Sequence, residues 1–169
     1  MDKELLKEMK KVIKINDLEK IKIIIDDNPG VLNEVTTSGT FLHVAAIKGQ
    51  YDAANYLIKR GIDVNKTGGT GDVYALTEAA FEGYLNIVEL LYNNGAVLDT
   101  STFARNPLFA AIYNHHIDVA KYLIDKGIDL SVTYPIGSID NCDAREYARQ
   151  YGCTEIVNYI DEKVKSEQI

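Results

Sequence analysis

The chain has 169 residues, 46% of them hydrophobic and 25% charged, which is the balance of a globular protein with a sizeable core. Its net charge of −7 argues against nonspecific nucleic-acid binding and favours a basic protein partner through electrostatic steering. No apolar run reaches the roughly 18 residues of a membrane span. Two cysteines are too few for a disulfide scaffold or a four-cysteine zinc site, so we expect free thiols and a cytoplasmic protein.

The first predicted unit, residues 1–33, pairs two helices. The first helix is charged and amphipathic, and it lacks the apolar core of a secretion signal. Asn16 takes the turn position, and Ile21, Ile24 and Ile25 follow in the second helix. The first helix is rich in lysine, as expected for an end unit, which has one face exposed to solvent.

Three central units, residues 34–67, 68–101 and 102–134, repeat one pattern: a short Ala-rich helix, a turn residue and a second apolar helix. Gly49, Gly83 and His115 are the turn residues, so the period is 34 and then 32 residues (83 − 49 and 115 − 83). A period of about 33 residues is typical of stacked helical repeats. Such stacks usually present a binding surface rather than a catalytic site.

Spacing within the central units separates the buried positions from the exposed ones. Because residues three and four apart share one helix face, each first helix is expected to bury one side, on which small alanines let neighbouring helices approach closely. In the first two central units the residues on this side are Leu42, Ala45 and Ala46, then Leu76, Ala79 and Ala80. Each second helix carries a broader apolar stripe and is expected to end at a left-handed glycine. The glycines in question are Gly61, Gly95 and Gly127.

The last unit, residues 135–169, fits the pattern less closely. Ala144, Ala148, Gly152 and Ile156 take the expected positions, at an interval of 37 residues from His115 to Gly152 (152 − 115). Residues 131–142 form a longer arm than in the other units. Insertions in repeat proteins fall on one loop face and often carry binding.

These residues closely resemble the ankyrin repeat family over residues 33–132. In the best unit the family pattern is matched by Thr40, Leu42, His43, Ala45, Ala46, Gly49, Leu57, Gly61, Val64 and Asn65. The resemblance implies an all-α solenoid of paired antiparallel helices with projecting β-hairpin-like loops, as a single domain over residues 1–169. It also implies protein–protein binding, and we expect no cofactor and no metal.

Two departures from the family pattern affect the expected geometry. His115 stands where the family has glycine, so we expect a positive φ and a slightly more stable His115→Gly variant. Residues 74–77 lack the Thr and His that tie the helix start to its loop in the family. We therefore expect a looser corner there.

The inner face of the first helices is the leading candidate for a binding surface. Each first helix is expected to expose a patch with i, i+3, i+4 spacing, and stacking aligns these patches into a row. The patches are Val44, Ile47 and Lys48; Glu78, Phe81 and Glu82; Ala110, Tyr113 and Asn114; and Tyr147, Gln150 and Tyr151. Large apolar groups at exposed positions are candidates for a binding hot spot, although packing against the next unit is the alternative.

Loop tips form the second candidate region. Phe103, Tyr134 and Ile136 are large groups near tips, where we expect the chain to cover them poorly. Residues 68–71 are glycine-rich but lack the Lys and the helix of a phosphate-binding loop, so they predict a flexible turn. The resulting partner-binding set is Ile47, Phe81, Glu82, Phe103, Tyr113, Asn114, Tyr134 and Tyr151.

No catalytic constellation is visible in the sequence. His43 takes the position of the family's structural histidine, whose ring is expected to bond loop backbone. His115 and His116 are adjacent and cannot form an i, i+4 metal pair. Neither cysteine has a neighbouring histidine in the sequence, although distant residues can converge in space.

The leading hypothesis is a non-enzymatic module, monomeric when free, that binds one protein partner through its concave face and hairpin tips. An inhibitor, an immunity protein against a toxin and an adaptor are three versions of it. One alternative is a structural spacer within a larger assembly. The other is an enzyme hidden in a repeat scaffold, and no sequence feature supports that second alternative.

Overall fold

A computed structural model describes residues 2–166 of the chain, so residues 1 and 167–169 of the expected end units lie outside the described part. Within it, ten α-helices follow one another in antiparallel pairs. The inner helix of each pair is α1 (Lys3–Lys14), α3 (Phe41–Ile47), α5 (Ala75–Glu82), α7 (Pro107–Tyr113) or α9 (Ala144–Gln150). The outer helix is α2 (Leu18–Asp27), α4 (Tyr51–Lys59), α6 (Leu85–Asn93), α8 (Ile117–Asp125) or α10 (Thr154–Ser166).

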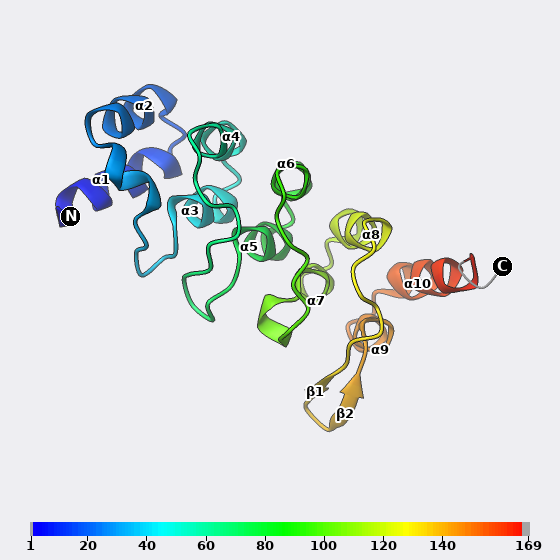
Figure 1. Cartoon of the computed structure of the whole chain (residues 1–169). Coiled ribbons are helices and arrows are strands. Elements are labelled where there is room, and N and C mark those ends of the chain that lie inside the picture. Colours follow the sequence, from blue (N-terminus) through cyan, green and yellow to red (C-terminus); the bar gives the residue numbers. More distant parts are fainter. Residues whose placement is uncertain (1, 167–169) are drawn as a thin grey trace.

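Successive pairs stack side by side, so the molecule is an elongated solenoid rather than a sphere (Figure 1). The inner helices form one row and the outer helices a second row, and each helix contacts its neighbours within its own row. The connecting loops project from the inner row, on the side away from the outer helices (Figure 1). The predicted all-α repeat architecture is confirmed.

Small alanines on the buried side of the inner helices allow this close stacking. Leu42, Ala45 and Ala46 in α3 are fully buried, as are the equivalent residues of α5. The outer helices contribute larger apolar groups, among them Leu57 and Leu91, to the same continuous core. The core therefore lies between the two rows and runs the length of the solenoid.

Side-chain caps and left-handed residues fix where the helices begin and end. Asn106 accepts hydrogen bonds from the N–H groups of Leu108 and Phe109 at the start of α7, and Asp143 accepts one from Glu146 at the start of α9. Beyond the outer helices, Gly61, Gly95 and Gly127 have φ values of 89°, 87° and 78°. The expected left-handed exits are confirmed.

The long arm before the last pair forms a β-hairpin. Strand β1 (Tyr134–Ile136) pairs antiparallel with β2 (Ile139–Cys142), and Tyr134 lies opposite Cys142. Two short 3-10 helices, η1 (Pro29–Asn33) and η2 (Phe103–Arg105), shape other loops. The hairpin brings Ile136 beside α7 and α9, where it contributes to the site described below.

One expectation about this arm is wrong, because Tyr134 is buried rather than uncovered, with 8% of its surface exposed. Its ring packs edge-on against Phe103 and Phe109, at centroid distances of 5.9 and 5.0 Å. Its hydroxyl donates to the Thr100 carbonyl at 2.6 Å and accepts from the Asn106 amide at 3.1 Å. Tyr134 thus fastens the hairpin to the preceding loop.

Neighbouring loops are tied together by a second set of polar contacts. The Thr77 hydroxyl donates to the Arg105 carbonyl at 2.8 Å, and the Arg105 guanidinium pairs with Asp72 at 2.5 Å. The corner at residues 74–77, expected to be looser, is therefore anchored through Thr77 instead of a histidine. In the extended arms, the Asn65 amide group bonds both the carbonyl of Gly95 and the N–H of Val97 at 2.9 Å.

Candidate functional site

Equivalent residues of the inner helices form two parallel rows along the solenoid. The first row, at the fourth helical residue, contains Val44, Glu78, Ala110 and Tyr147. The second row, three residues later, contains Ile47, Phe81, Tyr113 and Gln150. Exposure differs between the rows: Val44 and Tyr147 are buried, whereas Phe81 and Tyr113 remain 39% and 47% exposed.

The expectation that Val44 and Tyr147 lie on the open face is therefore wrong. Tyr147 is covered because Phe109 stacks on it at a centroid distance of 4.8 Å and Tyr151 approaches it at 4.6 Å. Val44, with 3% of its surface exposed, belongs to the apolar core. Helical spacing places a residue on a face, but the size of the groups beside it decides its exposure.

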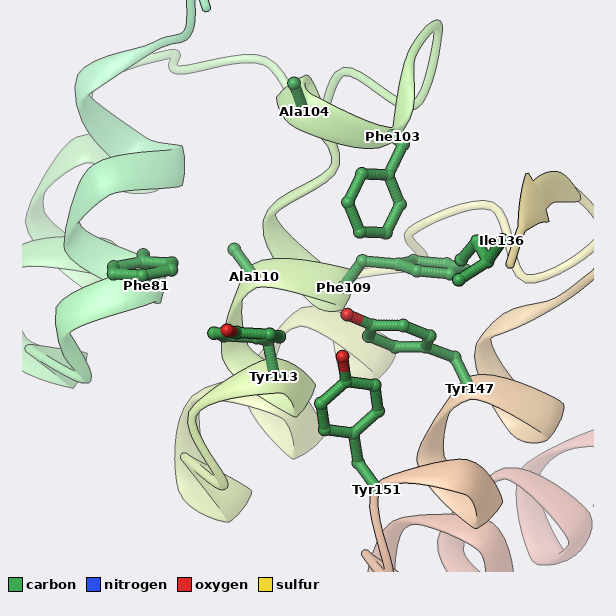
Figure 2. A pocket seen from close by; sticks show the side chains of 9 residues that line it. All are labelled: Phe81, Phe103, Ala104, Phe109, Ala110, Tyr113, Ile136, Tyr147 and Tyr151. Carbon is green, nitrogen blue, oxygen red and sulfur yellow. The ribbon is translucent and has the colours of Figure 1, made fainter. Parts of the chain in front are cut away.

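An aromatic pocket opens on this face between α5, α7 and α9. Its volume is about 520 Å³, within the range of pockets that hold ligands. No charged residue lines it. The lining residues, all labelled in Figure 2, are Phe81, Phe103, Ala104, Phe109, Ala110, Tyr113, Ile136, Tyr147 and Tyr151. We refer to this set as the aromatic pocket.

The rings of the aromatic pocket support one another from different units. Phe81 of α5 stacks on Tyr113 of α7, with centroids 6.0 Å apart and planes inclined by 17°. Tyr113 in turn approaches Tyr151 at 5.3 Å. Phe103, above the pocket in Figure 2, meets Phe109 edge-on at 5.7 Å. Contacts of this kind stabilise a pocket wall by more than the free energy expected from the buried area alone.

A small side chain leaves space inside the aromatic pocket, and neutral hydroxyl groups supply its polar atoms. Ala110 occupies the place between Phe81 and Phe109, where a larger side chain would fill the space (Figure 2). The hydroxyls of Tyr147 and Tyr151 point into the pocket (Figure 2). Burial and the hydrogen bond with Tyr151 raise the pKa of Tyr147, so its hydroxyl stays neutral and can donate at physiological pH.

Two carboxylates lie beside the aromatic pocket on α5. Glu78 is half-buried in the same row as Ala110, and Glu82 follows one helical turn later. Burial raises the pKa of the Glu78 carboxyl, and the negative charge of Glu82 raises it further. Among the described residues, no side chain forms an ion pair or a hydrogen bond with either carboxylate.

The structure brings together four of the eight residues expected to bind a partner. Phe81, Phe103, Tyr113 and Tyr151 all line the aromatic pocket. Tyr134 does not line the pocket but packs against two of its rings, Phe103 and Phe109. The other three, Ile47, Glu82 and Asn114, do not line the pocket.

Asn114 has a structural contact of its own. Its amide donates to the Phe81 carbonyl at 2.6 Å, and the His116 ring reaches the same carbonyl at 3.0 Å. Both residues thereby fix the end of α5 against the turn after α7. Ile47 is half-buried at the end of α3, which packs against α5 and contributes no residue to the aromatic pocket.

Sequence reasoning missed Phe109 as a pocket residue, although a signal was present. Phe109 is the third residue of α7, and the equivalent residues of α3 and α5 are His43 and Thr77. An aromatic ring at a position that is polar in two other units indicates a local change of packing. Here the rings of Phe103, Tyr134 and Tyr147 pack against Phe109.

The histidines act as structural groups or pair with a buried thiol. Nδ1 of His43 accepts from the Thr40 N–H at 3.2 Å, so the ring must donate through Nε2 to the Val73 carbonyl at 3.0 Å. This confirms the expected loop contact. His115 Nδ1 lies 3.3 Å from the sulfur of Cys153, a convergence that the sequence did not reveal. Burial raises the pKa of Cys153, which therefore stays a thiol.

Residues 2–166 contain no cluster of three or more His, Cys, Asp or Glu side chains arranged to hold a metal ion. Among the helices of the same residues, none combines the length and apolar character needed to cross a bilayer.

Two family models match the chain. One, described as ankyrin repeats (3 copies), matches residues 69–134, and the other, ankyrin repeats (many copies), matches residues 42–92. Together they span residues 42–134, which is more than half of the 169 residues. The matched region contains α3 to α8 and most of the aromatic pocket.

The chain is also similar to parts of larger curated proteins. It is 33% identical over 87 residues to protein fem-1 homolog A-like of Mus musculus, covering 52% of this chain and 13% of that protein. It is 36% identical over 118 residues to alpha-latrocrustotoxin-Lt1a of Latrodectus tredecimguttatus, covering 68% of this chain and 8% of the toxin. It is 34% identical over 103 residues to palmitoyltransferase AKR1 of Lachancea kluyveri, covering 57% and 14%. The chain thus spans a small fraction of each of these relatives.

Proposed function

The chain belongs to the ankyrin repeat family, whose repeats are generally protein–protein interaction modules, and we propose that it binds a protein partner through the aromatic pocket of its concave face. The loop tips beside the pocket, with Phe103 and Ile136, form part of the same binding surface. The partner's apolar side chains enter the pocket, and the rigid stack of helices holds the surrounding rings in place.

The observation that carries this proposal is the exposure of Phe81 and Tyr113. Both rings keep more than a third of their surface in contact with water, although burying a large aromatic ring is favourable. They stand together on one face and belong to a pocket rather than being scattered over the surface. Clustered exposed aromatic groups of this kind are typical of interaction sites.

The proposed action on the partner is inhibition or recruitment, without catalysis by this chain. An immunity protein that neutralises a toxin is one form of such an inhibitor, and an adaptor or spacer within a larger assembly is the alternative. The match to the palmitoyltransferase relative covers only 14% of that enzyme.

The test of the proposed surface is a quantitative affinity purification from the source cells with three tagged proteins. They are the wild type, a pocket variant with Phe81→Ala and Tyr113→Ala, and a control variant with Tyr51→Ala and Val97→Ala. The control residues are similarly exposed, at 39% and 45%, but lie outside the aromatic pocket. We expect one or more partners to be lost from the pocket variant and retained by the control.

Equal retention of every partner by a folded pocket variant would show that the aromatic pocket is not the binding surface. The immunity version is tested separately, by co-expression with the products of adjacent reading frames. Rescue of growth from a toxic neighbour supports it. The absence of rescue for every neighbour argues against immunity but leaves the partner-binding proposal intact.

A further inference from the structure

The carboxylates of Glu78 and Glu82 are an unusual feature of the face that carries the aromatic pocket. They lie one turn apart on α5, on the side of the helix that also exposes Phe81. Glu78 is half-buried and has no compensating cation among the residues that the structure describes. A carboxylate in that setting has lost part of its hydration without gaining a partner, which is unfavourable for the free protein.

The pocket next to these carboxylates is suited to a cation as well as to an apolar group. The rings of Phe81 and Tyr113 are both partly exposed to solvent on this face. Aromatic ring faces attract ammonium and guanidinium groups. The chain as a whole carries a net charge of −7, which steers basic partners toward it.

We propose that the occupant of the aromatic pocket is a segment of a partner protein in which a large apolar side chain is followed or preceded closely by lysine or arginine. The apolar side chain rests on Ala110, and the basic side chain reaches Glu78 and Glu82 across the Phe81 ring. This inference rests on the proposed function, because it names the chemistry of the partner at the same site.

The experiment selects short random peptides from a displayed library on four purified proteins. They are the wild type, a charge variant with Glu78→Gln and Glu82→Gln, the pocket variant with Phe81→Ala and Tyr113→Ala, and a control with Glu89→Gln and Glu162→Gln. The control also removes two negative charges, but from the outer helices α6 and α10. Selected peptides are then resynthesised and their dissociation constants are measured by fluorescence anisotropy.

We expect the wild type and the control to enrich peptides with an aromatic or leucine residue close to lysine or arginine. The charge variant should keep the apolar preference, lose the basic preference, and bind the wild-type peptides about fivefold to tenfold more weakly. This difference should shrink at high salt, because an exposed ion pair is screened.

Three other outcomes overturn one proposal or both. If the charge variant and the wild type enrich the same peptides with the same affinity, the basic partner is wrong but the pocket remains the binding site. If the pocket variant binds as the wild type does, the aromatic pocket is wrong as the site, and both proposals fail. Enrichment of no peptide above the pocket variant also counts against both.

A second copy of this chain is the competing occupant, and sedimentation of the wild type and the pocket variant tests for it. Dimers formed by the wild type but not by the pocket variant would replace the basic segment with self-association. The charge variant carries its own folding check. Because Glu78→Gln removes a half-buried charge, its Tm in the absence of peptide should equal or exceed that of the wild type.

Discussion

His115 has a left-handed backbone, with φ of 59°, at a position where the equivalent residues Gly49 and Gly83 have φ of 67° and 80°. The expected conformation is confirmed, and it costs a side-chain-bearing residue about 1 kcal/mol. The imidazole recovers part of this through its contact with Cys153. The thiol also lies 3.6 Å from the Ile112 carbonyl, so it keeps a partner without the histidine.

We expect His115→Gly to raise the free energy of unfolding by about 0.5 kcal/mol, because relief of the backbone outweighs the more flexible unfolded chain. The matched variant is His115→Ala, which loses the imidazole but keeps the unfavourable φ, and it should be less stable than the wild type. Urea denaturation of the three proteins measures the order. A glycine variant less stable than the alanine variant would contradict the assignment of strain to this position.

Protonation of His43 should destabilise the fold in mild acid. Burial lowers the pKa of His43, and its Nδ1 atom already accepts the Thr40 N–H, so a second ring proton has no place. At pH above about 6.5 the residue is neutral in both folded and unfolded chains and has no effect. Below that pH the unfolded chain binds a proton that the folded chain does not, so the free energy of unfolding falls as pH falls.

The expected slope from this one residue reaches about 1.4 kcal/mol per pH unit until the folded ring is protonated as well. We expect His43→Gln to remove this contribution, so the variant should lose less stability than the wild type between about pH 7 and pH 5.5. Denaturation at each pH, plotted as the difference between the two proteins, cancels the other titrating groups. Parallel curves over this range would contradict a neutral His43.

At the scale of elements, the loops between helices fit tightly against the neighbouring unit. The His116 ring, at the start of α8, lies over Gly83 at the end of α5, and a Cβ atom on Gly83 would come within 2.3 Å of its Nδ1 atom. Through Nε2 the same ring bonds the Phe81 carbonyl. The position of the aromatic pocket wall therefore depends on a glycine that admits the ring.

We expect Gly83→Ala to destabilise the protein by about 2–4 kcal/mol, from backbone strain together with displacement of the His116 ring. Gly95→Ala is the matched control, because Gly95 has a similar φ of 87° but nothing within 4 Å of the added atom. It should cost only about 1 kcal/mol. Combining Gly83→Ala with His116→Ala should recover part of the loss; strict additivity in the double variant would rule out this packing explanation.

At the scale of the whole molecule, stability is distributed along a row in which each pair of helices contacts only its neighbours. Helix α5 packs against α3 on one side and α7 on the other, whereas α1 and α9 lie at the two ends of the inner row. In such arrays the total stability is close to a sum of unit and interface contributions. Units in the middle gain two interfaces and the end units only one.

We therefore expect amide hydrogen exchange to be slowest in α5 and α7 and fastest in α1 and α10. Exchange mass spectrometry under native conditions measures this gradient, and the buried backbone of the central helices serves as the internal reference. Uniform protection from α1 to α10 would instead indicate that the solenoid opens only as a whole. The aromatic pocket spans α5 to α9, so its α9 side should be the more readily opened.

The amino-acid sequence alone was sufficient to predict the repeat, the order of the paired helices, the left-handed turns and the role of His43. These features follow from local spacing and backbone conformation, which neighbouring residues largely control. Four of the eight residues expected to bind a partner also meet in one pocket. The helical period predicts Phe81, Tyr113 and Tyr151, and the position near a loop tip predicts Phe103.

Three-dimensional packing determines which residues surround the aromatic pocket. Tyr134 and Tyr147 are buried although their positions in the sequence predict exposure, and Phe109 forms a pocket wall although its position predicts no role in binding. Their burial depends on rings contributed by η2, α7, β1 and α9, which lie far apart along the chain. The spacing of residues along a helix determines the direction of a side chain. Its solvent exposure depends on the other segments of the chain that pack against it.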